Sequence, residues 1–174
     1  MTVTALACRL ALAVVLALSA GGKARSAATF MAFQQSVKNL AAIPARWAVP
    51  TAAAVIAAES ACAVALLIPP AEIAGESLAL GLLAVFTVVI AAAVARGVRA
   101  PCHCFGTSSS PVSADQLLRN AFLIALAGLA LAGTALGGGA RISAGAFAVC
   151  LMAALPLAGA VAMWDDLADL LRKP

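Results

Sequence analysis

Apolar residues run almost without interruption through five stretches of this 174-residue chain. The stretches are Val3 to Ala20, Ala48 to Ile68, Leu78 to Ala95, Ala121 to Leu136 and Ala144 to Trp164. Each is close to the roughly 17–25 residues that a helix needs to cross a bilayer, and the fourth is the shortest. Residues that end helices separate them: Gly21-Gly22, Pro69-Pro70, Pro101 and the glycines from Gly137 to Gly139. The pattern predicts an all-α bundle of transmembrane helices.

The composition agrees with a membrane protein that has no soluble module. The chain is 64% hydrophobic and 10% charged, whereas a soluble domain is about half apolar and a quarter charged. We therefore expect one integral membrane domain over residues 1–174, surrounded by lipid. The net charge of +4 indicates loop charge and no nucleic-acid site, because the chain has no Tyr and few other aromatic residues.

Two features of the spans bear on how they pack. Small residues let helices approach closely in lipid, so the glycines inside the spans (Gly128, Gly133, Gly145 and Gly159) predict close contacts. The first stretch has an alternative interpretation as a cleaved signal peptide, since Leu18-Ser19-Ala20 is similar to a cleavage site. It lacks a basic n-region, which favours a spanning helix.

The long first connection, from Gly21 to Trp47, contains an amphipathic pattern. Phe30, Phe33, Val37 and Leu40 recur at helical spacing with polar residues between them. We expect a helix that lies flat at the membrane interface or covers the end of the bundle as a lid.

Basic residues are distributed unequally between the two sides of a five-span bundle. Nine fall on one side: Lys23, Arg25, Lys38 and Arg46 in the first connection, Arg96, Arg99 and Arg119 around the third, and Arg172 and Lys173 at the end. Only Arg9 and Arg141 fall on the other side. The positive-inside rule makes the side with nine charges cytoplasmic.

The connection between the third and fourth stretches carries the candidate chemistry, in Cys102, His103 and Cys104. In an extended segment, side chains two residues apart point the same way. A disulfide there has Cα atoms near the upper limit of about 6.8 Å, and strained, exposed disulfides exchange readily. The motif favours thiol–disulfide exchange, with His103 assisting thiolate formation. A soft-metal site for Cu or Zn and inert thiols are the alternatives.

Glu59 is the second candidate, near the middle of the second stretch. A charged residue there costs about 2.5–3.5 kcal/mol on insertion scales and usually marks a site. Cys62 shares its helix face. Glu59 is therefore either a buried proton carrier or a structural acid, hydrogen-bonded or paired with Lys23 or Arg9. As the single ionisable residue at this depth, in a chain without a clear repeat, it argues against a transporter.

The sequence from Cys102 to Gly106 resembles the Cys-Gly-Cys-Phe-Gly signature of the MauE family, methylamine utilisation proteins within a wider DoxX-like group of redox-associated membrane proteins. His103 stands where the family usually has Gly. Other matching positions are Gly22-Lys23, Glu59, Arg96-Gly97 and Leu118-Arg119-Asn120. The resemblance extends to about Ala130.

This resemblance implies a four-helix core, also similar to vitamin K epoxide reductase, with a fifth transmembrane helix added. It implies a bacterial inner-membrane protein that supports disulfide formation or maturation of an exported protein beside a thioredoxin-like partner. Cys102 and Cys104 would be the exchanging pair. A quinone acceptor follows from analogy alone, with Lys23, Glu59 and Cys62 as candidate contacts. The analogy puts the thiols on the exported side, against the charge count. A non-enzymatic scaffold for the partner is the main alternative function.

Overall fold

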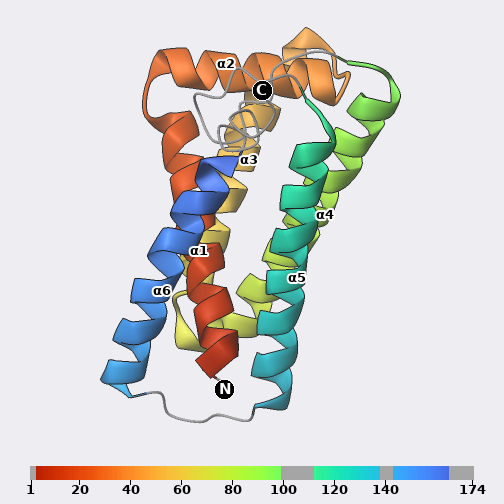
Figure 1. Ribbon diagram of the computed structural model, residues 1–174. Coiled ribbons are helices and arrows are strands. Elements are labelled where there is room, and N and C mark those ends of the chain that lie inside the picture. The colour runs from red at the N-terminus through yellow and green to blue at the C-terminus, as the bar shows by residue number, and fades with distance from the viewer. Residues whose placement is uncertain (1–2, 99–111, 138–142, 165–174) are drawn as a thin grey trace, which may run out of the picture.

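The computed structural model describes residues 3–98, 112–137 and 143–164, and the secondary structure of these residues is entirely helical (Figure 1). Cys102, His103 and Cys104 lie outside these ranges. The elements are α1 (Val3–Ala24), α2 (Ala27–Leu40), α3 (Ala45–Ala65), the short 3₁₀ helix η1 (Pro69–Ala71), α4 (Glu72–Ala95), α5 (Ala114–Leu136) and α6 (Ala144–Ala162). All but α2 and η1 are long and apolar enough to cross a membrane. The prediction of an all-α, five-span membrane bundle is confirmed.

Helix α1 forms the centre of the bundle (Figure 1). Its apolar side chains, among them Leu12, Val15 and Leu16, pack in one core with Cys62 of α3, Leu83 of α4 and Leu123 of α5. A helix enclosed on most sides is a structural member of the bundle. This favours a spanning helix over a cleaved signal peptide.

Helix α2 lies across one end of the bundle, as Figure 1 shows. Ser26 and Thr29 form a capping box that starts it, and its apolar residues Phe33 and Leu40 are buried against the spans. The guanidinium of Arg96, at the end of α4, donates a hydrogen bond of 2.5 Å to the carbonyl oxygen of Leu40. Of the two expected placements, the structure has the lid.

The facing ends of α4 and α5 are fixed by local signals. After α4, Gly97 adopts a φ of +67° and the N–H of Val98 bonds back to the carbonyl of Ala93 at 3.1 Å, the Schellman pattern that ends helices. Helix α5 starts after Ser113, which forms a capping box with Gln116. It therefore has 23 residues: the fourth apolar stretch is the shortest of the five, and the helix is extended beyond it by polar first turns.

Two expectations about glycine were wrong. Helix α1 continues through Gly21-Gly22 to Ala24, because Lys23 in its last turn is held by buried partners. A Cβ atom would meet nothing within 4 Å at three glycines inside the spans, Gly128, Gly145 and Gly159. The close approach occurs at Gly75, where a Cβ atom would lie 2.9 Å from the backbone nitrogen of Leu66.

Candidate functional site

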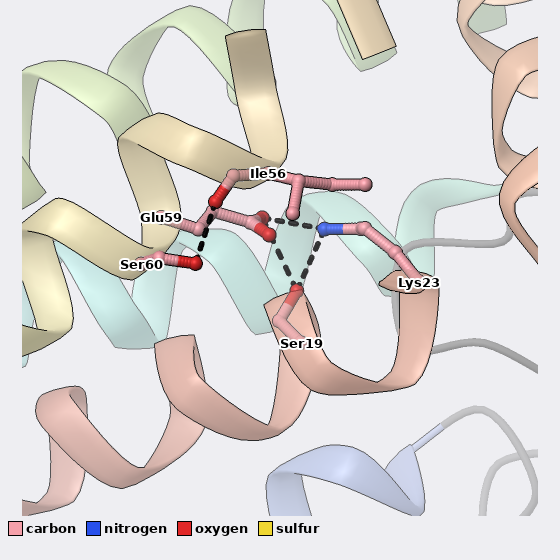
Figure 2. A network of polar contacts seen from close by, with 5 residues as sticks. All are labelled: Ser19, Lys23, Ile56, Glu59 and Ser60. Carbon is pink, nitrogen blue, oxygen red and sulfur yellow. Dashed lines mark hydrogen bonds and ion pairs between the residues drawn. The ribbon is translucent and has the colours of Figure 1, made fainter. Parts of the chain in front are cut away.

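A buried ion pair joins α1 to α3. The ammonium of Lys23 lies 2.5 Å from Oε1 of Glu59, and each side chain is 1% exposed. Lys23 also donates to Oγ of Ser19 at 2.7 Å, and Ser19 donates to the same Glu59 oxygen at 3.2 Å. Figure 2 shows these three side chains pointing toward one another, with Ser60 directed instead to the carbonyl of Ile56. The sequence alternative that paired Glu59 with Lys23 is the arrangement observed.

Four helices converge on the Lys23 ammonium. Besides Glu59, the ring centroids of Phe33 on α2 and Phe86 on α4 lie 4.7 and 5.8 Å from its nitrogen. Aromatic faces at this range attract a cation, more strongly where water is excluded. The charge is therefore stabilised by one carboxylate, one hydroxyl and two rings, which offset the cost of placing it inside a bundle.

An apolar cavity of about 140 Å³ lies beneath α2, between α3 and α4. Lys23, Ser36 and Thr51 are the polar residues among those that line it, and the surface of its wall is almost entirely apolar. The remaining lining residues are apolar: Phe33, Val37, Leu40, Ala41, Val55, Val85, Phe86, Val89 and Ile90. The cavity is suited to an apolar or flat aromatic group.

A second cavity, of about 20 Å³, lies on the other side of the ion pair. Its polar wall consists of Ser19, Glu59, Arg119 and Asn120, the last two from α5. Lys23 lines the first cavity and Glu59 the second, so the ion pair lies between the two cavities.

The remaining candidate residues are placed differently. Cys62 is fully buried, and its thiol donates to the carbonyl of Gly75 on α4 at 3.5 Å, so it contacts neither cavity. Cys8 and Cys150 are buried packing residues, as expected. Within the described ranges these three cysteines form no disulfide. No group of three or more His, Cys, Asp or Glu side chains in these ranges could hold a metal ion.

The sequence interpretation missed one buried acid and considered a different partner for Arg9. Glu76 of α4 is fully buried and accepts a hydrogen bond of 2.8 Å from Thr134 of α5. Arg9 forms an ion pair of 2.6 Å with Glu72. The predicted third stretch begins at Leu78, whereas helix α4 begins at Glu72 and includes both acids. Glu59 is therefore not the only buried ionisable residue in the described part of the chain, and Glu72 and Glu76 lie in the first turns of α4.

The charge count also changes. Lys23 and Arg119 lie within helices and are each 1% exposed, and Arg9 is 6% exposed. Positions inside the bundle do not act as loop charges. Removing them from the count made on the sequence leaves seven basic residues on the side predicted to be cytoplasmic and Arg141 on the other. The direction of the bias is unchanged.

Fold and site together define a multi-pass helical membrane protein with a buried ion pair between two cavities. A family model described as methylamine utilisation protein MauE matches residues 1–133, and the chain belongs to this family. The match runs from α1 to near the end of α5, which confirms the expected extent. Comparison with curated proteins and with solved structures gave no match.

Proposed function

We propose that this MauE family member is a membrane thiol–disulfide redox protein that supports disulfide formation in an exported protein. Cys102 and Cys104 are the exchanging pair in this proposal, and His103 assists thiolate formation. The observation that carries it is the position of the Lys23–Glu59 pair. Lys23 lies in the last turn of α1 and contacts the ring of Phe33 on α2. Helix α2 covers the bundle end where α4 ends and α5 begins (Figure 1), and the thiol motif lies in the sequence between these two helices.

Packing at this end supports the proposal. Leu40 of α2, Ala93 of α4 and Val112 just before α5 belong to one buried cluster. The residues flanking the thiol segment are therefore held against the lid, and the lid covers the cavity that Lys23 lines. A dithiol that is tethered at this end has a buried acid–base pair within the same bundle.

Oxidation of two thiols to a disulfide releases two electrons and two protons, so an acceptor for both is required. A quinone, when bound, supplies that chemistry by taking up two electrons and two protons. The apolar cavity fits such a group: Phe33 and Phe86 offer flat walls, and the stem of Lys23 is part of the lining. Glu59 then holds a proton at the opposite side of Lys23, in direct hydrogen-bond contact.

A thioredoxin-like protein is the proposed exchange partner and an exported protein the substrate. The seven-to-one charge bias favours a cytoplasmic position for the α2 end, whereas the vitamin K epoxide reductase analogy favours the exported side. The proposed location is the bacterial cell membrane. Labelling with a membrane-impermeant reagent determines on which side of the membrane the thiols lie.

The test is labelling of Cys102 and Cys104 by a membrane-impermeant maleimide in intact cells and in inverted vesicles, at a series of redox potentials. The two thiols should become reactive together, from one side only. Cys8→Ser and Cys150→Ser are matched controls that should leave the labelling unchanged. Thiols that stay unreactive at every potential refute the redox function. Substrate maturation that survives Cys→Ser at both positions indicates a scaffold, and Cu or Zn lost on His103→Ala indicates a metal site.

Quinone binding is tested separately by filling the apolar cavity. Val55→Phe places a ring in the space that Val55 lines, while Val64→Phe on the same helix changes a residue that is 56% exposed. Quinone-dependent reoxidation of the Cys102–Cys104 pair should slow in the first variant and be unchanged in the second. Equal rates in both would exclude this cavity as the quinone site.

A further inference from the structure

Two buried polar atoms at the second cavity have no hydrogen-bond partner within the described part of the chain. They are Oε2 of Glu59, a hydrogen-bond acceptor, and Nδ2 of Asn120, a donor. The two residues are 1% and 4% exposed, and both line the cavity. Buried polar groups are nearly always satisfied by protein or by ordered water. Because residues that carry an unsatisfied donor and an unsatisfied acceptor line the same small space, they point to a shared partner.

The size of this cavity and the residues that line it indicate which kind of partner binds there. A water molecule needs at least about 10–15 Å³ of accessible space and two to four polar contacts. The cavity provides about 20 Å³, and Ser19, Glu59, Arg119 and Asn120 line it. A larger ligand does not fit, and the positive charges of Arg119 and the nearby Lys23 disfavour a metal cation.

We propose that the second cavity is the binding site of one water molecule, which accepts a hydrogen bond from Nδ2 of Asn120 and donates one to Oε2 of Glu59. Asn120 is thus a positioning residue for this water. As a second part, which rests on the proposed redox function, the water relays protons to the ion pair. It takes up a proton released by thiol oxidation and gives one of its own protons to Glu59, so that its composition is unchanged.

The relay follows from the order of groups along the site. Water contacts Oε2 of Glu59, Oε1 of the same carboxyl contacts the Lys23 ammonium at 2.5 Å, and Lys23 lines the apolar cavity. A proton that reaches the carboxyl from α5 can therefore leave on the side of α1. Glu59 is not among the residues that line the apolar cavity. The second cavity is therefore the side from which a proton can reach Glu59.

The water site is tested by X-ray hydroxyl-radical footprinting of the intact protein in lipid nanodiscs, read by mass spectrometry. Radicals formed from a bound water label its immediate neighbours, here Leu16 and Leu123, which line the second cavity and not the first. Leu10 is equally buried at 2% and lines neither cavity, so it is the dry reference. Leu123 and Leu16 should be labelled well above Leu10. Equal labelling overturns the water site without need of any variant.

Asn120→Leu removes the donor, and Ala121→Leu, at the exposed neighbouring position, is its control. Labelling of Leu123 should fall about fivefold in Asn120→Leu, the factor that corresponds to one typical hydrogen bond, and be unchanged in the control. Asn120→Asp keeps the size of the side chain but replaces the N–H donor with an acceptor oxygen, so it should not restore labelling. Unchanged labelling in Asn120→Leu excludes Asn120 as the positioning residue.

The relay is tested by the rate of Cys102–Cys104 oxidation and its solvent deuterium isotope effect. In Asn120→Leu the rate should fall and the isotope effect should rise, because proton transfer becomes the slow step. An unchanged rate and isotope effect overturn the relay while the footprint still decides the water site. Thiols that are inert in the wild-type protein refute the proposed function and the relay together, again without affecting the footprint.

Discussion

Removal of one partner from the buried ion pair should destabilise the bundle strongly. Glu59→Leu leaves the Lys23 ammonium 1% exposed with no carboxylate at 2.5 Å. Breaking a buried pair costs about 3–5 kcal/mol, and an unpaired charge in a span costs about 2.5–3.5 kcal/mol on insertion scales. Ser19 and the two aromatic rings remain and offset part of this. We therefore expect a loss of about 3 kcal/mol in the free energy of unfolding. Lys23→Met with Glu59→Leu should be near neutral, because both charges and both desolvation costs disappear together.

The assay is reversible unfolding by SDS in bicelles, followed by the fluorescence of the two tryptophans. Glu59→Leu, Lys23→Met and the double variant form a cycle that isolates the coupling between the two residues. Ser60→Ala is the control, since this exposed hydroxyl bonds only the carbonyl of its own helix, at Ile56. If Glu59→Leu costs less than about 1 kcal/mol, or if the two single losses simply add in the double variant, the residues are not coupled as a buried pair.

The same titration and hydrogen exchange test two further contacts. Gly75→Ala should lower the free energy of unfolding by about 1–3 kcal/mol, because its Cβ would lie 2.9 Å from the Leu66 nitrogen. The control Gly128→Ala places its Cβ in open space and should be neutral or slightly stabilising. Equal effects of the two substitutions would refute the close approach at Gly75. Arg96→Met removes the 2.5 Å hydrogen bond to the Leu40 carbonyl and should speed amide exchange in α2 severalfold without changing α5; unchanged exchange in α2 would show that its apolar face alone holds it.

The five spans could be predicted from the sequence because length and hydrophobicity alone set them. Their ends could not, because they depend on short-range polar contacts. Helix α5 gains its first turns from the Ser113–Gln116 capping box, and α1 runs past two glycines because Lys23 has buried partners. In each case a hydropathy pattern assigns a polar residue to a connection, whereas in the structure that residue belongs to a helix.

The candidate site divides in the same way. Glu59 could be found from the sequence, since an acid within an apolar stretch is conspicuous, and Lys23 was one of two basic residues considered as its partner. The roles of Arg119, Asn120 and Glu76 could not be found, because a polar residue near a span end is as compatible with the interface as with the interior. The neighbouring helix decides whether such a residue is buried. Residues of α1 line the second cavity together with Arg119 and Asn120, and Thr134 of α5 bonds to Glu76.

The helix that lies beyond the family match makes a different kind of contact from the helices within it. Helix α6 packs on α1 through an apolar cluster of Leu6, Leu10, Ala11, Cys150 and Ala154, whereas the ion pair and both cavities are built from α1 to α5. In lipid, apolar helix contacts gain stability from close packing and carry little positional specificity. A buried ion pair holds two helices in one register, because a shift of one residue separates the charges. The geometry of the site is therefore determined by the portion of the chain that matches the family, and α6 supports α1 from the opposite side.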